Sequence, residues 1–361
     1  MPRFLLLLVT AIFQFSTVGC VHASDDLAVR MDTLIADTSV RPFNGVIVIS
    51  QNGDTLYQKA RGFADSETGR PLAISDRFRI QSNTKQITAV LVLREVERGS
   101  IDLRAPISTY LPDLRQQWAD QVTTHHLLNM TSGITSLDEP LAFPPGSSFH
   151  YSNPAYGLLG QILEKVTGAP YPEIAGQLFA EMGMNDTAVF LPGMDDAFVS
   201  GHMGTPDAPK PIAFADFGFS AEGWKAFMPT GGVISTASDL LIWDTSLHGG
   251  ELLAPESYDK LTEYSITRPD SAFAAAGAGY GYGVMIDDKS LFRSIGHAGR
   301  GMGFASMKFT IPEKDLTVVI LENVYLSPEN TEDPEVIYHF ETAIKDAVTG
   351  WLAAEPTSAT H

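Results

Sequence analysis

The sequence predicts an α+β fold, in which an antiparallel sheet is built from both ends of the chain, flanked by helices, with a mainly helical region inserted between. Strand-like segments lie at 44–62 and again at 304–321, near opposite ends of the 361-residue chain. Most segments with helical periodicity lie between them. Strands at both ends with helices in the middle are typical of α+β architecture.

The first strand pair is expected at 44–62 (NGVIVISQNGDTLYQKARG). Residues 46–49 are β-branched, and Asn52-Gly53 is a strong signal for a tight hairpin turn. Residues 55–59 then return as the second strand. The segment therefore predicts a β-hairpin near the start of the sheet.

Three middle segments predict helices. Residues 82–98 place apolar side chains at helical spacing and end before Gly99, and residues 154–167 begin with Pro154 and end before Gly168. Residues 236–248 have two candidate N-caps, Thr236 and Ser238.

The C-terminal third returns to strands. Residues 304–311 alternate in polarity, residues 316–321 form a buried-type run, and the intervening 312–315 (PEKD) predict a turn. A helix is expected at 334–353. Together these segments predict one domain at 24–361, with a sheet region at about 24–80 and 280–361 and a helical region at about 81–279.

The N-terminus predicts an export signal at 1–23. Arg3 precedes an apolar run at 4–13, which is shorter than the about 20 residues that a membrane span needs. Cleavage after Ala23 would release an exported, periplasmic or secreted protein. A competing lipoprotein-like box ends at Cys20, which would then carry a lipid.

The composition excludes several classes of protein. The formal charge is -19, which disfavours nucleic acid and anionic membranes as partners. Cys20 is the only cysteine, so neither a disulfide within the chain nor a cysteine nucleophile is expected. No cofactor or metal is expected, and the adjacent His125 and His126 are interpreted as structural because neighbouring helical residues point about 100° apart. The oligomeric state stays open.

Ser82 and Lys85 carry the first signal for chemistry, because they form an S-x-x-K pattern at the start of the 82–98 helix. Three residues are almost one turn, which puts both side chains on one face. A buried lysine can serve as the base that a serine nucleophile needs. The alternative is a capped helix with a solvated lysine, and a second S-x-x-K at Ser257–Lys260, interpreted as an exposed helix surface, shows how common the pattern is.

Two further triplets strengthen the functional interpretation. Tyr151-Ser152-Asn153 is the only Y-x-N in the chain. Tyr151 could transfer protons and Asn153 could bind an amide, although a core tyrosine before the Pro154 helix is the alternative. His297-Ala298-Gly299 leads into the C-terminal strands, where a strand edge could donate an N–H to an oxyanion. The H-x-G triplets at His202 and His248 are expected in a loop and at a helix end, respectively.

The ordered set resembles the serine β-lactamase and D-alanyl-D-alanine carboxypeptidase superfamily, and most resembles its class C β-lactamase-like branch. Segments 127–134, 145–168, 230–240 and 280–284 share the resemblance, which covers about residues 30–350. It implies a β-lactamase/transpeptidase-like fold. It also implies Ser82 as the nucleophile, with Lys85 and Tyr151 sharing the roles of general base and general acid and the division between them left open.

The resemblance also implies the substrate contacts. The backbone N–H groups of Ser82 and Arg300 would form the oxyanion hole beside Gly299, and Asn153 would hold an acyl-side amide. The chain departs from the class C pattern at His297, where those enzymes have a lysine that faces the substrate carboxylate. Because histidine need not be charged at neutral pH, the resemblance does not imply carboxylate recognition here. Arg300 would either restore a cation nearby or be an exposed loop residue.

The expected function is that of a serine hydrolase acting through a seryl acyl-enzyme on amide or ester bonds of a small molecule or peptide. A peptidase, amidase or esterase is favoured, with a neutral or cationic substrate. The alternatives are a true β-lactamase or D-Ala-D-Ala carboxypeptidase, and a non-hydrolysing penicillin- or peptide-binding protein. No G-x-S-x-G elbow, H-E-x-x-H helix or P-loop occurs in the sequence.

Overall fold

The computed structural model describes residues 18–194, 197–206, 208–268, 273–274, 277–327, 329 and 331–354. The expected signal run at 4–13 lies outside these residues. Helix α1 (Val18–Ala36) includes both expected processing positions. Among the described helices, none is long and apolar enough to cross a membrane.

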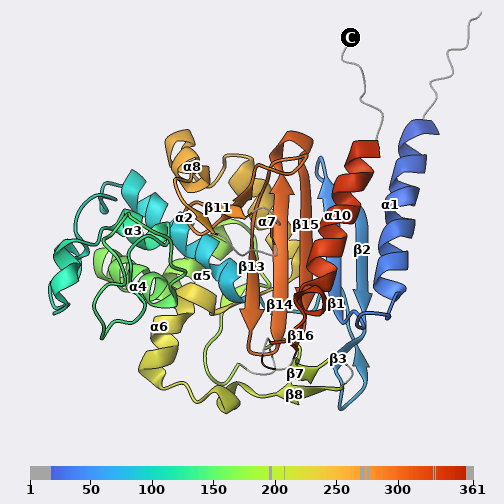
Figure 1. Cartoon of the computed structure of the whole chain (residues 1–361), viewed down its shortest axis with the longest axis horizontal. Helices are drawn as coiled ribbons and strands as arrows, with labels where there is room; N and C mark the ends of the chain where they lie inside the picture. The colour runs from blue at the N-terminus through green and yellow to red at the C-terminus, as the bar shows by residue number, and fades with distance from the viewer. Residues whose placement is uncertain are drawn as a thin grey trace, which may run out of the picture.

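An antiparallel sheet dominates the described part of the chain (Figure 1). In spatial order its eight strands are β10 (Thr267–Arg268), β11 (Ala278–Tyr280), β12 (Met285–Asp287), β13 (Ser294–Gly301), β14 (Phe304–Ile311), β15 (Leu316–Glu322), β1 (Gly45–Gln51) and β2 (Asp54–Arg61). The N-terminal hairpin joins the C-terminal strands through β1 and β15, in the register Val46 with Leu321 and Val48 with Val319. The sheet is therefore built from both chain ends, as the sequence predicts.

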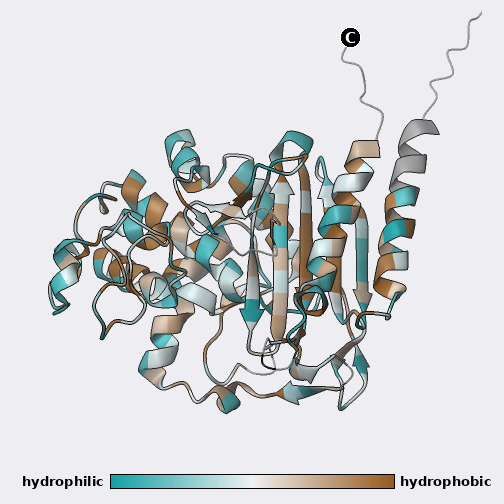
Figure 2. Cartoon of the chain, in the orientation of Figure 1, coloured by the Kyte–Doolittle hydropathy of each residue, from teal (hydrophilic) through white to brown (hydrophobic). Residues whose placement is uncertain are grey.

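Helices cover both faces of the sheet. Helices α1 and α10 (His339–Ala354) lie side by side on one face, and α7 (Ala237–His248) packs against β1 and β15. Leu27, Met31 and Ile35 are fully or almost fully buried, and their spacing of four places them on one side of α1. Figure 2 shows hydrophilic and hydrophobic residues alternating along α1 and α10, as expected for helices with one face in solvent.

The inserted region lies beside the sheet on the β11 and β13 side (Figure 1). Its helices are α2 (Thr84–Glu97), α3 (Thr124–Leu128), α4 (Asn153–Thr167), α5 (Tyr171–Glu181), α6 (Ala221–Gly231) and α8 (Pro255–Thr262). The smaller elements of the described chain are β3 (Phe63–Asp65), β4 (Arg70–Pro71), β5 (Phe78–Arg79), β6 (Ala188–Val189), β7 (Gly201–Thr205), β8 (Ala208–Ile212), β9 (Val233–Ser235), β16 (Val324–Tyr325) and α9 (Pro334–Ile337).

Several predicted boundaries are close to those observed. The hairpin, α4 and β14 match their predicted ranges to within a few residues, and Thr236 rather than Ser238 caps α7 by accepting a bond from Asp239 N. The predicted C-terminal helix breaks at Tyr338 into α9 and α10. The sheet also begins earlier than residue 280, because β10 and β11 belong to it.

Helix α2 is buried on almost all sides. Its sequence predicts one apolar stripe, but eleven of its fourteen residues are buried, Lys85 and Gln86 among them. Gln86 Oε1 accepts from Trp243 Nε1 at 2.7 Å and also from Lys308, which pairs with Asp244. These buried contacts fix α2 to both α7 and β14.

Candidate active site

Ser82 lies in a single 3₁₀ turn, η1 (Gln81–Asn83), that leads directly into α2. The turn is anchored to the sheet, because Asn83 Nδ2 donates to Ser306 Oγ at 2.8 Å and Ser306 Oγ donates to Ile80 O at 2.8 Å. Gln81 has φ +49°, in the left-handed region, and its Nε2 donates to Gly301 O at 2.9 Å. Such a conformation costs about 1–3 kcal/mol and persists only where the surroundings impose it.

Three side chains converge at this turn. Lys85 Nζ lies 3.0 Å from Ser82 Oγ and 4.9 Å from the centroid of the Tyr151 ring, and the Ser82 side chain acts on the Tyr151 hydroxyl by lowering its pKa. Tyr151 comes from the loop before α4, about seventy residues further along the chain. The structure therefore brings together the nucleophile, base and acid candidates that the sequence predicts.

The environment of Lys85 favours its neutral form. The side chain is completely buried, and burial together with the nearby Arg268 charge lowers the pKa of its ammonium well below the usual range. Its Nζ also donates to Thr230 O at 2.9 Å, which orients it toward Ser82. A lysine of this kind can accept a proton from serine near neutral pH.

Burial favours the protonated form of Tyr151, whereas it favours the unprotonated form of Lys85. It raises the pKa of the phenol to about 12, whereas the hydrogen bond to Ser82 and the charge of Arg268 oppose that rise. Tyr151 is thus a proton donor at neutral pH in the absence of substrate. Proton transfer from a neighbouring group would be needed to make it a base.

Asn153 is the first residue of α4 and is exposed, two residues from Tyr151. Its Oδ1 accepts a hydrogen bond from Thr230 Oγ1 at 2.8 Å. Thr230 therefore contacts both Lys85, through its carbonyl, and Asn153, through its hydroxyl. This residue was missed as a site residue by sequence reasoning, although it lies in the 230–240 segment that carries the family resemblance.

His297 lies on β13 beside Tyr151, with ring centroids 6.2 Å apart, and is completely buried. Its Nδ1 is 2.6 Å from Ala298 O and must donate there, so Nε2 accepts from the Tyr280 hydroxyl at 3.1 Å. Burial and the Lys85 charge lower the pKa of the imidazole well below its usual range. His297 is therefore a neutral group with both nitrogens engaged, and direct contact with substrate stays a prediction.

Gly299 allows β13 to approach the nucleophile. A Cβ at this position would lie 2.3 Å from Ile80 O and 2.8 Å from Ser82 N. The strand backbone that follows is thus next to the Ser82 amide. This arrangement suits the predicted oxyanion hole formed by the Ser82 and Arg300 N–H groups.

The Arg300 side chain does not supply a cation to the site. Its guanidinium pairs with Glu341 on α10, donates to Ile337 O at 3.2 Å and lies over the Tyr338 ring. The suggestion that Arg300 compensates for His297 is wrong, because side chains alternate along a strand and this one points to the face covered by α10. Arg300 is not an exposed loop residue either, since it lies within β13 with its side chain 16% exposed. Only its backbone N–H remains a site candidate.

The second S-x-x-K has a different setting. Ser257 and Lys260 lie on α8, as predicted, and Lys260 is exposed. Ser257, however, is 4% exposed, so its interpretation as an exposed surface residue is wrong. Helix α8 packs the face that carries Ser257 against the rest of the domain, so this serine is inaccessible.

The other histidines have structural contacts. His202 is a buried strand residue on β7 rather than a loop residue, and its Nε2 lies 2.8 Å from Ser66 Oγ. His248 ends α7, as predicted, and contacts Tyr258 OH at 2.8 Å. His125 contacts Tyr282 OH, and His126 takes part in the cap of α3. The described residues contain no cluster of three or more metal-binding side chains.

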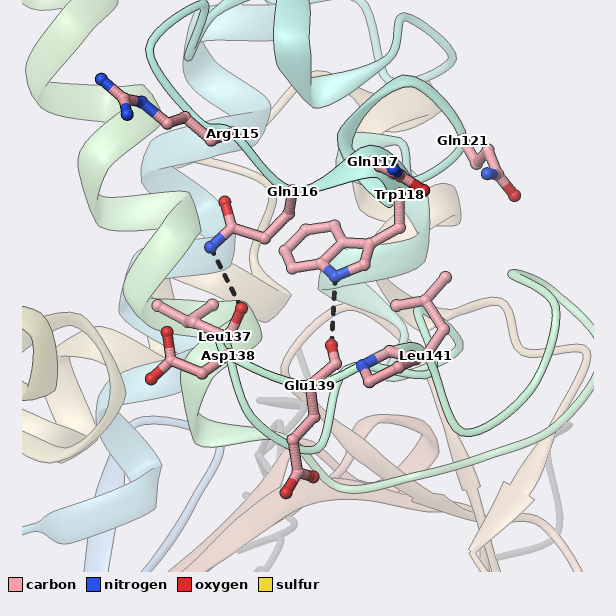
Figure 3. Close-up of a pocket in the computed structure, with 10 residues that line it drawn as sticks. Arg115, Gln116, Gln117, Trp118, Gln121, Leu137, Asp138, Glu139 and Leu141 are labelled. Carbon is pink, nitrogen blue, oxygen red and sulfur yellow. Dashed lines mark hydrogen bonds between the residues drawn. The ribbon is translucent and has the colours of Figure 1, made fainter.

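A cavity of about 560 Å³ lies between the segment 115–121 and the loop at 137–141 (Figure 3). Gln116 Nε2 donates to Leu137 O at 3.1 Å, and Trp118 Nε1 donates to Glu139 O at 3.3 Å. These bonds hold part of the 135–150 loop, whose course the sequence could not predict. The cavity is lined by none of the predicted catalytic residues.

Sequence reasoning missed two more residues at the site. Arg268, on the edge strand β10, has its Cζ 5.0 Å from the Tyr151 ring centroid. Tyr280, on β11, donates to His297 and lies 6.2 Å from the Tyr151 ring. Tyr280 belongs to the 280–284 segment that resembles the family, whereas nothing in the sequence around Arg268 points to the site.

Comparison with known proteins agrees with this geometry. The Beta-lactamase family model matches residues 36–340. The esterase EstB of Burkholderia gladioli is 30% identical over an alignment that covers 89% of this chain and 95% of the esterase. Penicillin-binding protein 4* of Bacillus subtilis (strain 168) is 26% identical, covering 87% of this chain and 73% of that protein.

Solved structures show the same fold. The octameric penicillin-binding protein homologue from Pyrococcus abyssi superposes with a TM-score of 0.72 at 26% identity, covering 88% of this chain and 77% of that one. The D-amino acid amidase from Ochrobactrum anthropi SV3 superposes with a TM-score of 0.73 at 22% identity, covering 92% and 98%. The fold is the β-lactamase/transpeptidase-like fold, and the chain belongs to the Beta-lactamase family of serine hydrolases.

Proposed function

We propose that this chain is a peptidase, amidase or esterase of the class C β-lactamase-like branch, acting through a seryl ester on Ser82. One observation carries the proposal: Lys85 Nζ hydrogen bonds to Ser82 Oγ at 3.0 Å and lies 4.9 Å from the centroid of the Tyr151 ring. A serine flanked by two such groups has a base for its proton and an acid for the leaving group. The similarity to an esterase over most of both chains supports this choice.

In the proposed first step, Ser82 Oγ attacks the acyl carbon of the substrate while its proton passes to neutral Lys85. The carbonyl oxygen becomes an oxyanion, which the N–H groups of Ser82 and Arg300 would stabilise. Breakage of the acyl–nitrogen or acyl–oxygen bond then releases the amine or alcohol. Tyr151 donates a proton to it and recovers one from Lys85.

The second step reverses these roles. Water attacks the seryl ester, gives a proton to the base and takes the acyl group, while Ser82 Oγ recovers its hydrogen. Lys85 lies close enough to Ser82 to move both protons, and the carbonyl of Thr230 holds it in place. Asn153 would hold the acyl-side amide or carbonyl.

The substrate preference follows from His297. Class C enzymes place a cationic lysine at this position, whereas the neutral, buried imidazole here offers no charge to a carboxylate. We therefore favour esters and amides whose binding does not depend on a carboxylate at this position over β-lactams.

Two serine variants test the proposal. Ser82→Ala should abolish hydrolysis and fluorophosphonate labelling, because no other group can form the ester. Ser257→Ala should leave both nearly intact, since that serine is buried away from the site. Equal losses in the two variants would contradict the assignment of Ser82.

Three chromogenic substrates tested side by side would define the class: nitrocefin, p-nitrophenyl butyrate and D-Ala-p-nitroanilide. We expect turnover of the ester or the anilide. Fast turnover of nitrocefin would instead identify a β-lactamase. A stable label from fluorescent penicillin, without turnover of any substrate, would identify a binding protein.

We also propose that the chain is exported. The short apolar run at 4–13 after Arg3 supports this. Expression of the full chain in a bacterium and intact mass measurement of the product would test it. A start at Ser24 would indicate a soluble exported protein, a lipidated Cys20 would indicate a lipoprotein, and a retained Met1 would contradict export.

A further inference from the structure

Two cationic side chains lie near the ring of Tyr151. Lys85 Nζ lies 4.9 Å from the ring centroid, and the guanidinium carbon of Arg268 lies 5.0 Å from it. Lys85 comes from the buried start of α2, whereas Arg268 comes from β10, at the edge of the sheet, and is half-buried. Cations this close to an aromatic ring are attracted to its electrons and are electrostatically coupled to its hydroxyl.

Three further titratable groups near Tyr151 come from other parts of the described chain. They are Tyr156 on α4, Tyr280 on β11 and His297 on β13. All three are completely buried, and burial favours the neutral form of each. None of them supplies a positive charge at neutral pH.

Arg268 differs from Lys85 in the constancy of its charge. Lys85 is held in an environment that favours its neutral form, and it must gain and lose a proton during the reaction. An arginine keeps its proton at any pH that a protein tolerates. With the Arg300 guanidinium paired to Glu341, Arg268 is the arginine that the described residues place against the proton-transfer pair.

We propose that Arg268 is a positioning residue for this reaction, a fixed cation that acts through Tyr151 and Lys85. It stabilises a phenolate on Tyr151 when that residue gives up its proton, and it keeps Lys85 unprotonated before that residue must accept the proton of Ser82. Arg268 on β10 would thus supply the positive charge that the neutral His297 on β13 does not supply. This inference rests on the proposed seryl-ester chemistry.

The expected sign is the same whichever group takes the Ser82 proton. Removing a cation raises the pKa of a nearby phenol, because the phenolate loses a favourable neighbour. It also raises the pKa of a nearby lysine, because the ammonium loses an unfavourable one. In either case the base becomes available only at higher pH, so the acidic limb of the pH–rate profile must move upward.

The test compares three variants of the full chain with the wild type. Arg268→Gln removes the charge, and Arg268→Lys keeps it. Arg293→Gln removes a charge from an exposed arginine before β13, which donates to Thr262 O and does not contact the Tyr151 ring. The rate of fluorophosphonate labelling of Ser82 and kcat/KM for p-nitrophenyl butyrate are measured from pH 5 to pH 10, with Tm as the control for folding.

We expect the acidic limb of Arg268→Gln to move up by about one pH unit or more, because a charge within about 6 Å has an effect of this size. Arg268→Lys should return the acidic limb most of the way to its wild-type position, and Arg293→Gln should match the wild type. An unshifted limb in Arg268→Gln would overturn the inference. So would a folded Arg268→Lys whose limb stays with that of the glutamine variant, since a role that needs only the shape of arginine is not electrostatic.

The two levels of the proposal fail differently. If the wild type is not labelled at Ser82, or if Ser82→Ala keeps full activity, the seryl-ester mechanism is wrong and this inference falls with it. If Ser82 is labelled and required but the acidic limb of the pH–rate profile does not depend on the charge at position 268, only the role of Arg268 is wrong.

Discussion

Replacing Gly299 with alanine should separate β13 from the nucleophile turn. The added Cβ would lie 2.3 Å from Ile80 O and 2.8 Å from both Ser82 N and Ser306 Oγ. Because two of these three atoms belong to the backbone, no side-chain rotation relieves the contact. Carbon atoms of this kind are not found closer than 3.0 Å, so strand and turn must move apart by at least about 0.7 Å, the difference between 3.0 and 2.3 Å.

That displacement acts on the oxyanion hole, which the amides of Ser82 and Arg300 are proposed to form. A misplacement of about 1 Å can lower a rate about 100-fold, so we expect kcat/KM to fall by about 10- to 100-fold. Overpacking should cost about 1–3 kcal/mol of unfolding free energy. Ester hydrolysis and fluorophosphonate labelling measure the first effect, and urea unfolding measures the second.

Gly350→Ala is the matched control. Gly350 lies within α10, and nothing lies within 4 Å of the Cβ it would gain. Alanine in a helix interior is favoured by about 0.5–1 kcal/mol, so this variant should be slightly more stable with unchanged kcat/KM. A Gly299→Ala enzyme with wild-type kcat/KM would refute the placement of the oxyanion strand against Ser82.

Two further predictions concern buried charges. Lys308→Met should lower the unfolding free energy by about 3–5 kcal/mol, because Asp244 is 2% exposed and would keep an uncompensated charge. The double variant Lys308→Met/Asp244→Leu should recover much of the lost stability in urea unfolding. A double variant that recovers none of it would contradict the pairing. Lys85→Met should abolish activity yet be more stable than the wild type at pH 7, because the folded state holds Lys85 with a lowered pKa and the unfolded state does not. The folded wild type therefore binds fewer protons than the unfolded chain, so its unfolding free energy rises as the pH approaches 10.5. The stability advantage of Lys85→Met should shrink over that range. A constant difference in unfolding free energy from pH 6 to pH 10 would show that the pKa of Lys85 is not perturbed.

The sequence predicts most of the framework because local patterns determine it. Asn52-Gly53 sets the hairpin turn, and Thr236 caps α7 through its own hydroxyl. The ordered S-x-x-K, Y-x-N and H-x-G motifs identify side chains that meet at Ser82 or on the adjoining strand. Their order along the chain was sufficient, because each belongs to a recognisable element.

Long-range packing accounts for the features that were missed. Glu164 Oε1 accepts from Tyr171 N and its Oε2 pairs with Lys225, which ties α4 to α5 and α6, and no local sequence pattern predicts these contacts. Local polarity suggested an exposed Ser257, and nothing around Arg268 distinguished it from any other edge-strand arginine. Such positions depend on which distant element covers them, and this information is not in the neighbouring residues.

The pairing of β1 with β15 has a consequence for how the protein is made. Strand β1 is complete after 51 residues, but its partner ends at Glu322, so the hairpin and Ser82 leave the ribosome long before the strands that flank them. Contacts of such sequence separation form slowly, since a long loop must close first. Until β13 has emerged the nascent chain has a nucleophile without its oxyanion strand, and until β15 has emerged that strand is not joined through the sheet to the N-terminal hairpin. Hydrolytic activity should therefore arise only after nearly the whole chain has been synthesised, and a chain that stops before β15 should have none.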